Sequence, residues 1–202
     1  MRPFLFLLFV VLMACQAHAG RVRLGKITAS GDGCPNANSL NFTISPDSRA
    51  LSVLFDQLVV ESGGATTRRE ETKTCSFTLQ IELPAGENLA VAQVDYRGFV
   101  FGEKQNIFNH MSSDFYLDQK PVRHFERKFK GPINDVFTLS EVVPMRERHK
   151  SNCTGKLNLN VAIRLTTRTN PQGEATMLAL DSLDAANRKG GIVYGLDFTP
   201  CH

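Results

Sequence analysis

The chain has 202 residues, with 23 lysines and arginines against 20 aspartates and glutamates. This near balance excludes a strongly basic protein of the kind that binds nucleic acids. The length is typical of one domain of the sandwich or barrel kind, large enough to bury a substantial core.

The first residues have the three parts of a secretory signal peptide. Arg2 precedes an apolar run from Phe4 to Ala14, and small residues flank His18 at positions 17–19. Cleavage after Ala19 therefore leaves residues 20–202 as a single secreted domain. The apolar run is shorter than the roughly 20 residues that a membrane-spanning helix needs. Because no later stretch is apolar enough to replace it, no transmembrane segment is expected.

An alternative form of processing follows from Leu12-Met13-Ala14-Cys15, which is similar to a bacterial lipoprotein signal. In that case Cys15 is acylated, becomes the N-terminus and anchors the protein to a membrane. Met13 fits this pattern poorly, so simple cleavage is the favoured prediction.

An even set of four cysteines remains after either form of processing: Cys34, Cys75, Cys153 and Cys201. In an exported chain such a set predicts two disulfides. Three pairings are open, and we favour the nearest-neighbour one, Cys34 with Cys75 and Cys153 with Cys201. Zinc is disfavoured because the spacings contain no Cys-x-x-Cys, and neither a metal nor a cofactor is expected.

Most of the mature sequence alternates between apolar and polar residues, which is typical of half-buried β-strands. The turn residues at 46–49 predict a hairpin between the first two strands. The charged stretch at 61–74 is expected to be a solvated connection, and residues 182–189 are expected to form one or two helical turns. About ten strands are predicted, at 41–45, 51–60, 75–83, 89–101, 114–117, 123–129, 136–141, 157–166, 175–180 and 192–198.

Many short strands joined by glycine and proline turns favour an all-β fold. We expect an antiparallel β-sandwich, immunoglobulin-like or jelly-roll-like, held by two disulfides. A β-barrel is the alternative architecture.

Several motifs occur in a specific order along the mature chain. They include Gly33-Cys34-Pro35, Ser45-Pro46-Asp47, Asp95-Tyr96-Arg97-Gly98-Phe99 and Asp181-Ser182-Leu183-Asp184, with Cys75 and Cys153 each preceding an alternating strand. In these motifs the chain resembles the exported family known as domain of unknown function 4360. The resemblance implies a secreted single domain with the same four cysteines, and it implies no activity.

Two groups of polar residues are candidates for a site. Asp95 and Arg97 share one face of a predicted strand, and we expect a structural pair that anchors an edge or an inter-sheet hydrogen bond, with Gly98 permitting a bulge. Arg123, Arg127 and Lys128 belong to a basic stretch with interleaved phenylalanines, expected at a sheet edge. They form a possible anion-binding site, although a charged edge that prevents aggregation explains them as well.

No catalytic residue is predicted, because the chain lacks the sequence signatures of serine hydrolases, nucleotide-binding loops and metalloproteases. Carboxylates brought together by folding could still form a glycosidase. Asn41 and Asn152 are formal glycosylation acceptors. The aspartates considered for the glycosidase are Asp56, Asp95, Asp114, Asp181, Asp184 and Asp197.

These observations predict a non-enzymatic extracellular or cell-surface binding module that displays loops as its variable surface. Its partner is expected to be an extracellular polysaccharide or a cell-surface protein. The alternatives are a small secreted hydrolase that acts on a glycan through paired carboxylates, and a secreted effector or inhibitor.

Overall fold

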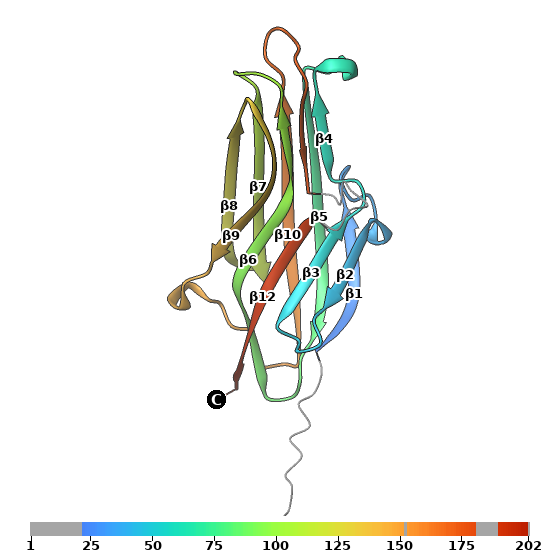
Figure 1. Cartoon of the computed structure of the whole chain (residues 1–202). Helices are drawn as coiled ribbons and strands as arrows, with labels where there is room; N and C mark the ends of the chain where they lie inside the picture. The colour runs from blue at the N-terminus through green and yellow to red at the C-terminus, as the bar shows by residue number, and fades with distance from the viewer. Residues whose placement is uncertain (1–21, 152, 181–189, 202) are drawn as a thin grey trace, which may run out of the picture.

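A computed structural model describes residues 22–151, 153–180 and 190–201 (Figure 1). The predicted signal peptide, Cys15, Asn152 and the helical turns expected at 182–189 lie outside the described residues. Over these residues the chain forms twelve strands, three short 3-10 turns and no α-helix. The strands are β1 (Arg23–Ser30), β2 (Leu40–Ile44), β3 (Ala50–Phe55), β4 (Val59–Ser62), β5 (Glu70–Glu82), β6 (Glu87–Gly102), β7 (Phe108–Leu117), β8 (Lys120–Lys130), β9 (Ile133–Val142), β10 (Lys156–Arg168), β11 (Thr176–Ala179) and β12 (Gly191–Pro200), and the turns are η1 (Ala37–Ser39), η2 (Gly64–Thr66) and η3 (Met145–Glu147).

The strands form two antiparallel sheets that stack face to face (Figure 1). The five-stranded sheet has the order β1-β5-β10-β7-β8. The seven-stranded sheet has the order β2-β3-β12-β6-β11-β4, and β9 pairs with the other edge of β6. This arrangement confirms the predicted antiparallel sandwich. The sheets stay separate, so the alternative of a closed barrel is wrong.

The core lies between the sheets because alternate side chains of each strand point inward. Four aromatic pairs join one sheet to the other across this layer. Tyr96 of β6 stacks on Phe125 of β8 with ring centroids 4.4 Å apart. Offset and edge-to-face aromatic pairs of this kind stabilise a core beyond the area that they bury. The other three pairs are Phe42 with Phe77, Phe115 with Tyr194, and Phe129 with Phe137.

The two disulfides hold different parts of the sandwich. Cys34, in the loop after β1, is bonded to Cys75 on the inner face of β5, and both cysteines are fully buried. Cys153, before β10, is bonded to Cys201, directly after β12. The first bond therefore ties the loop after β1 to the inner face of β5, whereas the second ties the two sheets together. These are the nearest-neighbour pairs.

The structure differs from the sequence prediction at three places in the first third of the chain. Strand β1 is absent from the prediction, because a bulge between Leu24 and Ile27 breaks its alternation. The strand predicted at 51–60 is two strands, since the polar pair at 56–57 interrupts the apolar run and β4 pairs with β11 instead of β12. The connection predicted at 61–74 is wrong for its last residues, which belong to β5.

The charged start of β5 is compatible with a strand because its charges are paired across the sheet. Glu70 lies opposite Arg168 of β10, with 2.7 Å between the Glu70 Oε2 and Arg168 Nε atoms. The guanidinium lowers the pKa of the Glu70 carboxyl below its ordinary value. The charged residues therefore indicate that these side chains are exposed, but they do not indicate that the backbone forms a loop.

Two buried tyrosines should make the fold sensitive to high pH. Burial raises the pKa of Tyr96 from its ordinary value of 10.0 to about 12, and it raises the pKa of Tyr194 well above that ordinary value. Both side chains are fully buried. In the unfolded chain tyrosine ionises near pH 10, so stability is fully present below pH 10 and is lost as the pH rises toward 12.

We expect Tyr96 alone to account for a loss of about 1 kcal/mol of unfolding free energy between about pH 9 and about pH 11. Urea denaturation at about pH 9 and about pH 11 would measure it. The double variant Tyr96→Phe, Tyr194→Phe is the control, because it removes both ionisable groups and should show a shallower pH dependence. Equal slopes for the two proteins would contradict the prediction.

Candidate functional site

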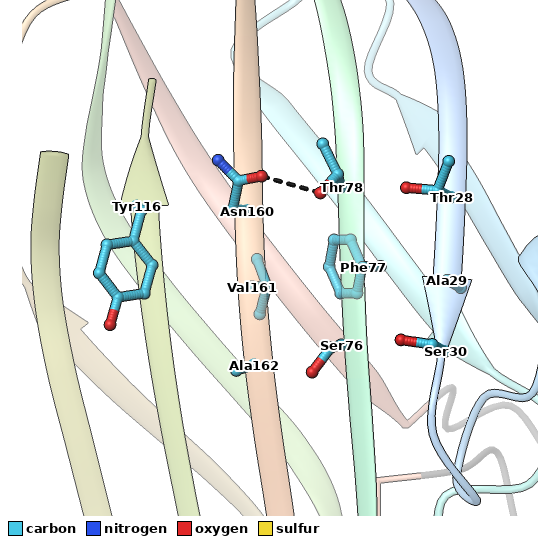
Figure 2. Close-up of a pocket in the computed structure, with 10 residues that line it drawn as sticks. All are labelled: Thr28, Ala29, Ser30, Ser76, Phe77, Thr78, Tyr116, Asn160, Val161 and Ala162. Atoms are coloured by element: carbon cyan, nitrogen blue, oxygen red, sulfur yellow. Dashed lines mark hydrogen bonds between the residues drawn. The ribbon is translucent and has the colours of Figure 1, made fainter. Parts of the chain in front are cut away.

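A hollow of about 330 Å³ lies on the outer face of the five-stranded sheet. Figure 2 shows its lining, with Tyr116 of β7 on one side and Thr28 and Ser30 of β1 on the other. Each lining residue belongs to a strand. The complete set is Thr28, Ala29, Ser30, Ser76, Phe77, Thr78, Tyr116, Asn160, Val161 and Ala162.

Strand alternation and register explain why these side chains meet. Phe77 and Val161 point inward and are buried, so their neighbours in sequence point outward. The register places Asn160 of β10 opposite both Tyr116 and Thr78. The Tyr116 ring therefore lies beside a floor of small side chains.

The lining combines hydroxyl and amide side chains with apolar surface, and it carries no formal charge at neutral pH. Thr78 Oγ1 donates a hydrogen bond to Asn160 Oδ1 over 2.8 Å, which fixes the orientation of the amide. Figure 2 shows the Asn160 amide nitrogen on the side away from Thr78. The hollow thus offers a donor, several hydroxyl groups and one aromatic face to a ligand from solvent.

A second hollow of about 200 Å³ lies on the outer face of the seven-stranded sheet. It forms above Gly191, which has a φ of +135°, and an added Cβ there would meet the Val53 carbonyl oxygen at 2.3 Å. Arg97 and Leu54 lie at its sides. Gly190, which also lines it, directly follows the segment 181–189 outside the described residues, so we assign this hollow no function.

Asp95 and Arg97 lie together on the outer face of β6, with 3.6 Å between Asp95 Oδ2 and Arg97 Nη2. Gln93 donates a hydrogen bond to Asp95 Oδ1 over 2.7 Å. Because β6 is paired along both edges, this cluster anchors neither a sheet edge nor a contact between the sheets. Gly98 pairs regularly with Phe137, and the expected bulge lies instead at the step from β12 Gly195 to Leu196.

Arg123 lies at the open side of the sandwich, on the edge strand β8. Its Nη2 is 3.3 Å from Glu141 Oε2 of β9, and its Nη1 is 3.2 Å from Glu147 Oε2 of η3. The guanidinium therefore joins the five-stranded sheet to β9 of the seven-stranded sheet and to the turn η3 that follows β9. Two carboxylates of the same chain already occupy the positions that an external anion would need.

The other two residues of the basic stretch have separate surroundings. Arg127 lies over the ring of Phe129, 5.8 Å from its centroid. Lys128 Nζ is 2.8 Å from Glu126 Oε1, and Lys128 lowers the pKa of that carboxyl. The anion-binding role of Arg123, Arg127 and Lys128 stays a prediction, with two of the three cations paired within the chain.

Of the aspartates proposed for a glycosidase, Asp181 and Asp184 lie outside the described residues, and Asp114 and Asp197 each lie beside a basic side chain. Asp114 lies 2.7 Å from His124 Nδ1, and Asp197 lies 3.0 Å from Arg148 Nη1. Neither of the two hollows above is lined by an aspartate or a glutamate. Among residues 22–151, 153–180 and 190–201, no group of three histidine, cysteine, aspartate or glutamate side chains is placed to hold a metal ion.

The family profile described as "Domain of unknown function (DUF4360)" matches residues 20–201. The chain belongs to this family. A relative from Arthroderma benhamiae, named "Uncharacterized secreted protein", is 28% identical over 169 residues, which cover 82% of this chain and 67% of the relative. The family, the sandwich and the two disulfides thus agree with the resemblance seen in the sequence.

Two solved structures are similar to this DUF4360 chain in part. One is TmCBM61 in complex with β-1,4-galactotriose, with a TM-score of 0.28 and 10% identity over 86% of this chain and 88% of that one. The other is the enzymatically active domain of bacteriophage CBA120 tailspike protein 4, with a TM-score of 0.25 and 15% identity over 85% of this chain and 19% of that one. Because both TM-scores are below 0.5, these likenesses establish neither a shared fold nor a shared ligand.

Within the described residues of the DUF4360 chain, no helix has the length and apolar character needed to cross a membrane.

Sequence reasoning does not identify the hollow, although it predicts the strands that carry most of its residues. The signal that the sequence contains is the outward row of Ser76, Thr78 and Asn160 on two strongly alternating strands. Tyr116 lies in the predicted strand 114–117, but those four residues are too few to show a regular alternation.

Proposed function

We propose that this DUF4360 protein is an extracellular binding module that holds an uncharged polysaccharide on the outer face of its five-stranded sheet. The observation that carries the proposal is the set of uncharged hydroxyl and amide side chains in the hollow beside the ring of Tyr116. The predicted leader, the two disulfides and the relative named as secreted support an extracellular location.

The chemistry of the lining matches that of a neutral sugar. A sugar ring presents hydroxyl groups at its edge and C–H groups on its faces. Hydroxyl and amide side chains such as Thr78 and Asn160 can donate and accept hydrogen bonds with those hydroxyls. The electron-rich face of an aromatic ring such as Tyr116 attracts the C–H groups. A charged ligand would find no opposite charge in the lining.

Affinity gel electrophoresis tests this proposal against several classes of polysaccharide side by side. The secreted protein would be run through gels that contain a neutral glucan, galactan, mannan or xylan, with an anionic polyuronate for comparison. We expect at least one neutral polysaccharide to retard the protein. If no neutral polysaccharide retards it, or if only the polyuronate does, the proposal fails.

Tyr116→Ala should weaken this binding by about tenfold or more, as expected when a central aromatic contact of an interface is lost. Phe108→Ala is the matched control, because Phe108 is a half-buried aromatic on the outer face of the same strand and does not line the hollow. Melting temperatures would show that both variants fold. Wild-type affinity in Tyr116→Ala would contradict the assignment of the site.

A further inference from the structure

The hollow is a trough that crosses the strands. In one row, Tyr116 of β7 lies opposite Asn160 of β10, Asn160 lies opposite Thr78 of β5, and Thr78 lies opposite Thr28 of β1. Neighbouring strands are about 4.8 Å apart, so this row spans about 14 Å. The second row, Ala162, Ser76 and Ser30, lies beside it and provides the width.

Neither end of the trough is closed by a lining residue from a loop. At one end lie Thr28 and Ser30 on β1, which is the edge strand of the sheet. At the other end the neighbour of Tyr116 is Pro121, an exposed residue on the opposite edge strand β8. A site that recognises the end of a sugar chain needs a wall against that end. The lining of this trough provides no such wall.

We infer that the trough binds an internal segment of the polysaccharide chain, which crosses the strands from Tyr116 to β1 and continues beyond the edge of the sheet. This inference rests on the proposed function and adds the part of the polymer that is recognised. Tyr116 holds one sugar at the β7 side, and the hydroxyls of Thr28 and Ser30 contact a later sugar in the same chain.

The number of chain ends provides the first test. The polysaccharide that retards the protein would be partly hydrolysed to long fragments, which multiplies its ends and leaves the mass of internal segments almost unchanged. At equal mass we expect the same retardation before and after hydrolysis. Retardation that rises in proportion to the number of ends would overturn the inference while leaving the proposed function intact.

Variants at the β1 end provide the second test. The double variant Thr28→Ala, Ser30→Ala should bind long oligosaccharides of the same sugar about fivefold more weakly, as expected for a lost hydrogen bond. It should bind the shortest oligosaccharide with measurable affinity as the wild type does. Tyr116→Ala, in contrast, should weaken both. Equal weakening of short and long ligands by the β1 variant would overturn the crossing arrangement.

Ser112→Ala is the control for these measurements. Ser112 points outward from β7, as Tyr116 does, and does not line the trough. Titration calorimetry of each variant with the oligosaccharide series would give the affinities. If the wild-type protein binds no polysaccharide at all, the proposed function itself is refuted, and that result is obtained before the series begins.

Discussion

Replacing Cys34 and Cys75 together by alanine is expected to lower the free energy of unfolding by about 4 kcal/mol. The disulfide closes a loop of 41 residues, for which the loss of chain entropy in the unfolded state gives about this value. Both cysteines are also fully buried, so removing their sulfur atoms leaves a cavity in the core, which lowers the stability further. Urea denaturation of the double variant would measure the loss.

The second disulfide provides a matched comparison. Cys153 and Cys201 close a loop of 48 residues, so the entropic contribution should be nearly the same. Cys153 is exposed and Cys201 is only partly buried, and their replacement by alanine therefore leaves no cavity. We expect this variant to be the more stable of the two. The reverse order would show that burial of the first bond adds nothing.

Gly98→Ala should also destabilise the protein strongly, by about 3 kcal/mol, which is typical of overpacking in a core. A Cβ atom at this position would lie 2.1 Å from the carbonyl oxygen of Ala179 and 2.7 Å from Phe137 Cζ. The carbonyl belongs to the paired strand β11 and has little freedom to move. The expected result is a clear fall in melting temperature.

Gly195→Ala is the control for this substitution, since Gly195 lies on β12 and a Cβ atom there would make only ordinary contacts of 3.4 Å or more. We expect it to change the stability little. A similar loss in both variants would mean that glycine is needed in these strands for a reason other than the space at position 98.

The strands of the centre of the fold are predictable because their alternation is regular. The inward set on β10, from Leu157 to Leu165, is buried in the structure as its period of two requires. Strand β1 is not predictable, because its bulge changes the face on which the next side chains lie. The start of β5 escapes prediction because its ion pair with β10 depends on a partner nearly a hundred residues away.

The candidate site is less accessible to sequence reasoning than the fold. Alternation indicates that Thr78 and Asn160 point outward, but it does not say which strands are neighbours or in which register. The meeting of β1, β5, β10 and β7 is a property of the complete sheet. Likewise, the basic residues around Arg123 suggest an anion site in the sequence, whereas the structure places Glu141 and Glu147 beside its guanidinium.

The trough consists of strand residues, whereas the sequence favours loops as the variable surface. Along each strand the outward positions that line it alternate with inward positions of the core, such as Phe77 and Val161. Evolution can therefore change the specificity of this face one side chain at a time, without insertions, deletions or repacking. Within the family, ligand preference would then diverge by substitution at outward positions such as 28, 78, 116 and 160, while chain length and core stay the same.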